Sequence, residues 1–190
     1  MVLPGAVLFP HALMPLYIFE PRYRAMLTHA LEHDRVFCVA LLNESAIEEE
    51  NREPFHRTAG IGLVRACVGH EDGTSHLVLQ GLARVDLRQM VQESPFPIAE
   101  IRELWPASSD PDEVAVLCSE LRERCLAIPI PDKAIRQKLD EQLTQISDPS
   151  VLGDLVAHTF LKNSSSQQEV LQERNIANRL RIVLNHLADI

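Results

Sequence analysis

The residues with the greatest chemical potential are two histidines that flank a glutamate. His29, Glu32 and His33 form an H-x-x-E-H pattern, in which inverzincins bind zinc through both imidazoles and use the glutamate as a base. Such a site needs a third ligand, and the spacing of the other histidines supplies none. Histidine is favoured at a helix C-terminus, and short motifs often match by chance. We therefore interpret this segment as a solvated helix face and expect no metal and no cofactor.

Two further groups of polar residues have structural interpretations. Cys67 and His70 form a C-x-x-H pair beside a turn, which is a weaker version of the same metal pattern. Glu20, Arg22 and Arg24 resemble an acid–base set. Charged residues at a helix start are more often a structural network of ion pairs and backbone contacts. We expect that network rather than a catalytic centre.

The motifs of nucleotide-dependent and hydrolytic enzymes are missing from this sequence. It has no G-x-x-x-x-G-K-[ST] loop to bind phosphates and no G-x-S-x-G motif. Lysine is scarce, and no lysine follows a glycine. A Ser–Lys dyad would have to use one of three residues in helix-like stretches, which are Lys133, Lys138 and Lys162. We therefore expect a chain that is not an enzyme.

Composition limits the remaining classes. The chain has 190 residues, 46% of them hydrophobic, and a formal charge of −9 from 18 basic and 27 acidic residues. An acidic chain without a basic run argues against nucleic-acid binding. No segment is long and apolar enough to span a membrane. The four cysteines lack a C-x-x-C pair and are expected to be buried free thiols, as in a reducing cytoplasm.

Hydrophobic periodicity predicts an α+β fold with two subdomains, residues 1–106 and 107–190. In the first, residues 7–9 read as a buried strand, residues 16–19 as a second strand, and residues 21–33 as an inserted helix. Further strands are expected at 36–42, 58–68, 76–80, 82–91 and 98–104, with a break at Gly81 and a surface loop at 43–57. Mixed and antiparallel strands of this number suggest a small, partly open, barrel-like sheet.

The second subdomain shows the helix start signals and apolar spacing of a helical bundle. Asp110 and Asp148 each precede a proline, which predicts a capped helix start. Ser166 and Glu169 predict a capping box, and Asn175 predicts the cap of the last helix. Helical spacing also predicts a helix whose inward face is Ile135, Leu139, Leu143 and Ile146.

Three blocks of the chain resemble the N-terminal, substrate-recognition domain of Lon ATP-dependent proteases. The first is the opening, with Leu8-Phe9-Pro10, Pro15-Leu16 and Ile18-Phe19-Glu20-Pro21-Arg22-Tyr23. The others contain Gly60, Asp72-Gly73, Gly81 and Arg84, then Leu171, Glu173, Arg179 and Leu180. The resemblance implies a PUA-like, barrel-like sheet joined to a C-terminal helical bundle. It also implies a stand-alone form of the domain, without the ATPase and protease domains of Lon.

This resemblance implies a non-catalytic module that binds unfolded or degron-bearing polypeptides, with a protease or a chaperone as a further partner. Bulky apolar residues are the candidate contacts, namely Phe9, Leu13, Met14, Phe55, Phe96 and Trp105. The motif residues are expected to be structural, namely Phe19, Glu20, Pro21, Arg22 and Tyr23. Two alternatives remain open: a small-ligand or RNA binder that uses the PUA-like barrel, and a zinc hydrolase that uses the His29–His33 segment.

Overall fold

A computed structural model describes residues 1–46 and 53–188. The chain divides into two compact units, Met1–Leu104 and Trp105–Ile190. The division falls two residues before the expected one at 106/107. None of the helices in the described part of the chain is long and apolar enough to cross a membrane.

A six-stranded, mostly antiparallel sheet forms the first unit. Its strands run in the order β1-β3-β4-β5-β2, with β6 paired to β5. Among the described strands, β1 and β3 pair in parallel and the other pairs are antiparallel. The bounds are β1 Val2–Leu3, β2 Leu13–Ile18, β3 Val36–Leu41, β4 Thr58–Gly69, β5 Ser75–Gln92 and β6 Ile98–Glu103. The α+β prediction is confirmed. Since no pairing joins β1 to β2 among the described strands, barrel closure stays a prediction.

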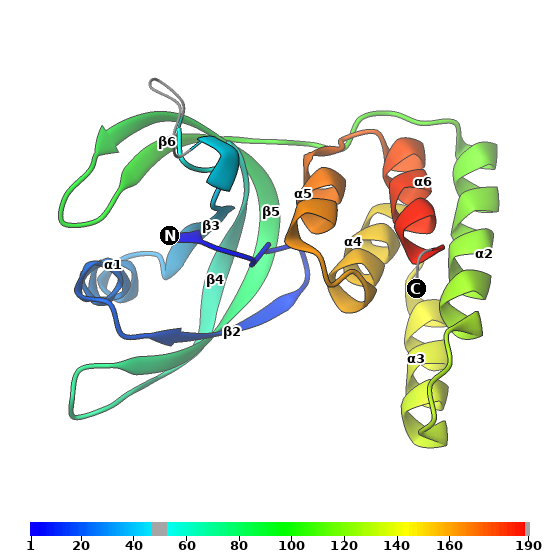
Figure 1. Ribbon diagram of the computed structural model, residues 1–190, viewed down its shortest axis with the longest axis horizontal. Coiled ribbons are helices and arrows are strands. Elements are labelled where there is room, and N and C mark those ends of the chain that lie inside the picture. Colours follow the sequence, from blue (N-terminus) through cyan, green and yellow to red (C-terminus); the bar gives the residue numbers. More distant parts are fainter. Residues whose placement is uncertain (47–52, 189–190) are drawn as a thin grey trace. The chain divides into compact units, whose positions relative to one another are not determined.

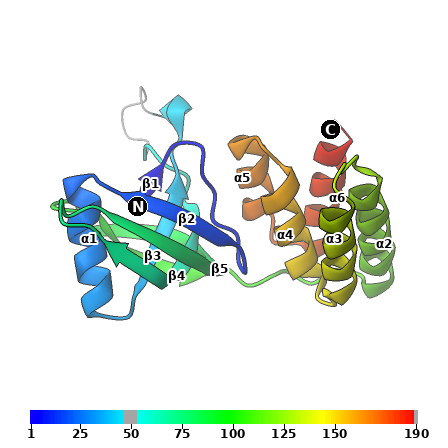
Figure 2. The ribbon, with the colours of Figure 1, turned by 90° about the horizontal axis from the view of Figure 1, so that it is seen from below.

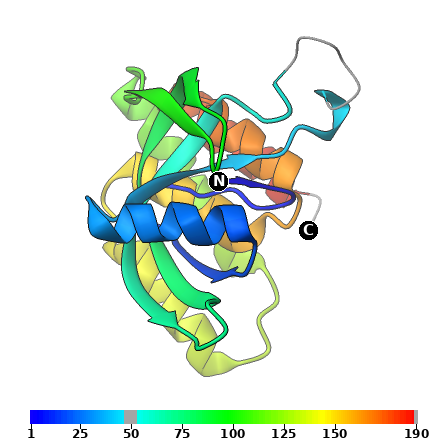
Figure 3. The same cartoon turned by 90° about the vertical axis from the view of Figure 1, so that its left-hand side faces the viewer.

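Helix α1 (Pro21–Glu32) provides the apolar partner of this sheet. It crosses the strands at one end of the unit (Figures 2 and 3). Its buried residues Tyr23, Met26, Leu27 and Ala30 join a core cluster with side chains from β2, β3, β4 and β5. The expected helix at 21–33 is therefore confirmed.

The segment Val7–Phe9 is buried as expected, but it is not a strand. It crosses over the sheet, so close that a Cβ on Gly60 would overlap the carbonyl oxygen of Leu8. A Cβ on Gly81 would likewise overlap the carbonyl oxygen of Phe9. The two glycines are thus required by the crossing backbone rather than by a turn.

Strand β5 runs without interruption through Gly81, where the sequence suggested a break. The residue stays in the ladder because its N–H donates to the carbonyl of Ala12 at 2.9 Å and its carbonyl accepts from the N–H of His11 at 2.8 Å. The strand bends strongly along its length (Figure 1). Its first part pairs with β2 and its last part with β6.

The motif before α1 fixes the start of the chain to the helix. The Tyr23 hydroxyl donates to the Val2 carbonyl at 2.6 Å and accepts from the Val2 N–H at 3.3 Å. Pro21 occupies the first turn of α1, and Glu20 forms an exposed ion pair with Arg22 at 2.9 Å. These contacts are structural in kind. Phe19 differs from the expectation, because 58% of it is exposed and its side chain adds nothing to the core.

Five helices form the second unit: α2 Pro111–Ala127, α3 Lys133–Gln145, α4 Pro149–Phe160, α5 Ser164–Gln172 and α6 Ile176–Leu187. Each begins after an Asp or Asn side chain that accepts a hydrogen bond from a first-turn N–H. The predicted caps Asp110, Asp148 and Asn175 are confirmed. The predicted capping box is wrong, because α5 is capped by Asn163 and Ser166 already lies in its first turn.

Helix α3 buries much less than its apolar spacing predicts. Only Leu143 is buried, whereas Ile135 is exposed and Leu139 and Ile146 are half-buried. Arg122 of α2 fixes the end of α3, since its guanidinium donates to the carbonyls of Leu143 at 3.1 Å and Ile146 at 2.9 Å. Hydrogen bonds from Arg122 therefore stabilise the end of α3, a helix that buries few apolar side chains.

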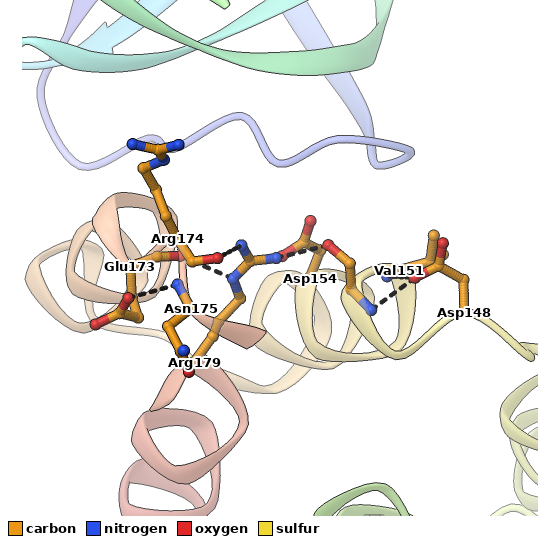
Figure 4. Close-up of polar contacts among 8 residues, drawn as sticks. Asp148, Val151, Asp154, Glu173, Arg174, Asn175 and Arg179 are labelled. Atoms are coloured by element: carbon orange, nitrogen blue, oxygen red, sulfur yellow. Dashed lines mark hydrogen bonds and ion pairs between the residues drawn. The ribbon is translucent and has the colours of Figure 1, made fainter. Parts of the chain in front are cut away.

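A buried ion pair joins α4 to α6 in this unit. Arg179 has no exposed surface, Asp154 has 1%, and their charged groups lie 3.3 Å apart. The same guanidinium donates to the Ser150 hydroxyl at 2.7 Å and to the backbone carbonyls of Glu173 at 2.9 Å and Arg174 at 3.4 Å (Figure 4). Because the network is enclosed and satisfied within the bundle, we assign it to stability rather than to chemistry.

Candidate functional site

A cavity of about 310 Å³ lies in the first unit and is lined mostly by apolar side chains. Its walls come from β1, α1, β3, β4, β5, β6 and the segments that lead into β4 and β6. They include Met26, Ala30, Phe37, Cys38, Phe55, Ile61, Leu87, Met90, Phe96, Ala99 and Ile101. An apolar cavity of roughly 150 Å³ holds one benzene ring. This cavity therefore has room for one or two large apolar side chains.

Flexible and aromatic side chains dominate the wall. Three of the four methionines of the chain, Met1, Met26 and Met90, line the cavity. Methionine is unbranched and polarisable, so it adapts to ligands of different shape. Phe55 and Phe96 add flat apolar surface. A wall of this kind suits varied apolar groups rather than one rigid ligand.

Few polar groups reach this cavity. His29 and Asp34 line it and are exposed to solvent. Burial raises the pKa of the Cys38 thiol above its ordinary value, so the thiol stays neutral and behaves as an apolar group. The lining of the cavity is therefore mostly apolar, with His29 and Asp34 as its exposed polar residues.

Strand β2 presents a second apolar surface, which we call the β2 surface: Leu13, Tyr17 and Phe19 with Val68 of β4. The exposed fractions of the three β2-side residues are 55%, 49% and 58%. Tyr17 and Phe19 stack with ring centroids 5.8 Å apart. A shallow hollow adjoins them, lined by Pro15, Leu16, Tyr17, Ala66, Cys67, Val68, His76, Leu77 and Val78.

The position of β2 gives this surface a hydrogen-bonding edge as well. The strand ends the order of the sheet and pairs only with β5 among the described strands. An end strand leaves a row of backbone N–H and C=O groups to which an extended segment can add. Pro15 interrupts that row, because proline has no N–H to donate.

The predicted contact residues fall in different places. Phe55 and Phe96 come together in the cavity, and Leu13 lies on the β2 surface. Phe9 is fully buried and Met14 retains 8% exposure, so these two belong to the core and offer no surface to a partner. For Met14 the reason is the alternation of side chains along β2, which turns Met14 inward and Leu13 outward.

Trp105 is the remaining predicted contact residue, and it belongs to the second unit. Its side chain is exposed, and its backbone carbonyl accepts from the guanidinium of Arg174 at 3.0 Å. It therefore lines neither the cavity nor the β2 surface.

Sequence reasoning missed several residues of these sites. Met26, Phe37 and Met90 looked like ordinary core positions at helix and strand spacing. Phe19 belonged to the motif that we interpreted as structural, and Tyr17 was not singled out. The alternation of β2 is the signal that could have found Tyr17, because it shares a face with the candidate Leu13.

The two metal motifs touch these sites through one residue each, His29 in the cavity wall and Cys67 in the hollow beside the β2 surface. Within residues 1–46 and 53–188, no group of three or more His, Cys, Asp or Glu side chains is arranged to hold a metal ion. The rings of His29 and His33 lie 4.2 Å apart, and His33 Nδ1 is 2.7 Å from the His29 carbonyl oxygen. This contact engages Nδ1 of His33 and leaves its Nε2 free, so the pair offers at most two imidazole ligands and lacks the third that a zinc site needs.

Comparison with known proteins places this arrangement in a family. The family model of the ATP-dependent protease La (LON) substrate-binding domain matches residues 1–189. The chain belongs to this family. The match lies on the substrate-binding domain and on neither the ATPase nor the protease domain of Lon.

Curated Lon proteases resemble the chain over nearly all its length. Lon protease 2 of Thermus thermophilus is 24% identical over 180 residues, which cover 95% of this chain and 22% of the relative. The Lon protease of Desulfosudis oleivorans is 24% identical over 196 residues, which cover 100% and 24%. The chain thus spans about a quarter of the length of these relatives.

Solved structures of Lon N-terminal domains share the fold. The N-terminal domain of the Mycobacterium avium complex Lon protease matches with a TM-score of 0.77 at 18% identity, over 100% of this chain and 96% of that one. A Lon N-terminal domain protein from Xanthomonas campestris matches with a TM-score of 0.67 at 20% identity, over 97% and 95%. At these identities the likeness establishes the α+β fold alone.

Proposed function

We propose that this chain is a non-catalytic module that binds unfolded or degron-bearing polypeptides. The observation that carries the proposal is the apolar cavity, with its methionine and phenylalanine walls and room for one or two large side chains. Membership of the Lon substrate-binding domain family supports the same class of ligand. The β2 surface offers a second place where an extended segment can lie.

Energetics favour a ligand with several weak anchors. Burying one large apolar side chain contributes about 1.5–3 kcal/mol. Association costs at least about 4 kcal/mol in lost translational and rotational freedom. One side chain in the cavity does not cover that cost, so a second contact is needed. An unfolded chain can supply both, whereas a folded protein keeps its large apolar side chains inside.

The alternative is a small-ligand or RNA binder that uses a PUA-like barrel. The formal charge of −9 disfavours RNA, because phosphate binding depends on clustered Lys and Arg. The lining of the cavity has no guanidinium or ammonium side chain among the described residues. The PUA-like relationship and barrel closure belong to the proposal, and so does a protease or chaperone as a further partner.

The test is binding of a fluorescently labelled, permanently unfolded polypeptide, followed by anisotropy, with its folded parent as the comparison. Ala99→Phe places a ring in the cavity and is expected to weaken binding at least tenfold, or about 1.4 kcal/mol. Ala115→Phe is the matched control, because Ala115 is exposed on α2. Its binding is expected to equal that of the unaltered chain.

The possible outcomes test the location of the binding site and the binding function separately. Equal affinity of Ala99→Phe and the unaltered chain would remove the cavity as the binding site and turn attention to Tyr17→Ser on the β2 surface. Failure of the unaltered chain to bind the unfolded polypeptide would refute the function itself. Circular dichroism of both variants confirms that they are folded.

A further inference from the structure

The hairpin that joins β4 to β5 holds two imidazoles against each other. His70 Nε2 and His76 Nδ1 share a hydrogen bond of 2.8 Å, and the ring planes are nearly perpendicular at 88°. His70 directly follows β4, and His76 is the second residue of β5. Both side chains are exposed, so solvent and ions reach them freely.

The loop between these strands fixes the position of His70. Its N–H donates to the Thr74 carbonyl at 2.9 Å, and its carbonyl accepts from the Gly73 N–H at 2.9 Å. Asp72 Oδ1 accepts from the Thr74 N–H at 2.9 Å and from the Thr74 hydroxyl at 2.7 Å. Gly73 takes a φ of +80°, which side chains rarely tolerate. His70 is thus held in place by its own turn.

The ring of His76 is held from the other side. It stacks on Tyr17 of β2 with centroids 4.6 Å apart. Tyr17 and His76 are also direct partners in the β2–β5 ladder. The two imidazoles are therefore held close together before any ligand arrives, which lowers part of the entropic cost of binding one.

The distance between the two nitrogens fits chelation. With metal–nitrogen bonds of about 2.1 Å, nitrogens 2.8 Å apart subtend an angle of about 84° at the metal. That is close to the right angle between neighbouring ligands in octahedral and square-planar complexes. The rings must tilt to aim both lone pairs at one point, and their exposure allows it. The hydrogen bond between the two nitrogens is then replaced by the metal, and each ring carries its proton on its other nitrogen.

The charge of the loop favours a cation. Glu71 and Asp72 are exposed acidic residues of the loop that joins His70 to His76. The guanidinium of Arg24 lies at Gly73 and offsets one of them. The side chains around the imidazoles therefore keep an excess of negative charge.

We propose that His70 and His76 form a bidentate site for a late first-row divalent cation of the Ni²⁺, Cu²⁺ or Zn²⁺ type. Imidazole nitrogen is a preferred ligand of these ions. The chain supplies two ligands and water completes the coordination, so the ion is exchangeable rather than structural. Its predicted effect is to hold the end of β4 and the start of β5 together, next to the β2 surface.

Calorimetric titration with Ni²⁺ of the chain without a histidine tag tests this proposal. Ni²⁺ is the probe because imidazole suits it, whereas thiolates select Zn²⁺ and Cu⁺. His29 and His33 are the other close histidine pair, so the titration is made in a His33→Ala background. That background is expected to bind one Ni²⁺ per chain, and its Tm is expected to rise with Ni²⁺ concentration.

Adding His70→Ala to this background removes one ligand and leaves the folded core untouched, since His70 is exposed. Affinity for Ni²⁺ is expected to fall at least tenfold, and the rise in Tm is expected to disappear. His76→Ala is expected to give the same result. Unchanged Ni²⁺ affinity in His33→Ala/His70→Ala would overturn the site, and so would the absence of Ni²⁺ binding in His33→Ala alone.

Discussion

Removing the guanidinium of Arg179 is the perturbation with the largest expected effect on stability. Arg179→Met keeps an unbranched side chain in the space but takes the cation away from Asp154. Arg179 and Asp154 are 0% and 1% exposed, so water cannot replace the lost partner. The hydrogen bonds to the Ser150 hydroxyl and to the Glu173 and Arg174 carbonyls are lost as well.

The magnitude follows from burial. Breaking a buried ion pair by removing one partner costs about 3–5 kcal/mol, because the remaining charge stays desolvated. Domains of this size are stable by only about 5–15 kcal/mol. The variant is therefore expected to lose a large part of the free energy of unfolding of the helical unit.

Urea unfolding followed by far-ultraviolet circular dichroism measures this loss. Arg181→Met is the matched control on the same helix, because Arg181 pairs with Glu113 at the surface and such pairs contribute about 0–1 kcal/mol. Asp154→Leu combined with Arg179→Met removes both charges and is expected to recover part of the loss. An Arg179→Met variant no less stable than Arg181→Met would refute this reasoning, as would a double variant whose loss equals the sum of the single losses.

Three further predictions concern single groups. Tyr23→Phe removes the hydroxyl that holds β1 and is expected to cost about 0.5–1.5 kcal/mol, with faster amide exchange in β1 as the measurement. Gly81→Ala is expected to cost about 1–3 kcal/mol or more in urea unfolding, whereas Gly69→Ala, whose Cβ would meet only a side-chain oxygen at 3.9 Å, is the neutral control. Burial raises the pKa of Cys125 from 9.0 to about 12. The unfolded chain therefore ionises this thiol first, and the contribution of the thiol to stability is complete below pH 9 and declines above it. Comparison with Cys125→Ala over that pH range measures the decline, and a pH-independent difference would contradict it.

Local signals explain why the helical unit could be read from the sequence. A cap depends on one side chain and the next three backbone N–H groups, so Asp110, Asp148 and Asn175 indicated helix starts directly. Asn163 was missed because a serine run follows it and Ser166 with Glu169 matches a capping box. The burial of Ile135 could not be read at all, because spacing shows which face is apolar and not whether anything packs on it.

The errors in the sheet unit have a long-range cause. The apolarity of Val7–Phe9 correctly indicated burial, but a strand and a crossing segment bury the same side chains. The contacts of this segment with Gly60 and Gly81 distinguish a crossing segment from a strand. These glycines lie more than fifty positions away in the chain, so the sequence near Val7–Phe9 carries no sign of them. For the same reason Gly81 looked like the end of a strand.

The candidate site was predictable in part. Phe55 and Phe96 were singled out as bulky apolar residues near prolines, and the fold brings both to one cavity. Met26 and Met90 have no comparable sequence signal, because they come together only through the packing of α1 with the sheet. The role of all four in binding stays a prediction until the anisotropy measurement is made.

The crossing of the sheet by Val7–Phe9 has a consequence for the order in which the chain folds. The surface that receives this segment consists of β4 and β5, which include Gly60 and Gly81. Val7–Phe9 precedes both strands in the sequence, so it has no surface to pack on until β4 and β5 have been synthesised and have paired. Closing such a loop costs entropy before any contact repays it, which slows folding. The segment Val7–Phe9 is therefore among the last parts of the first unit to become ordered, and until then its apolar side chains are exposed to chaperones and to aggregation.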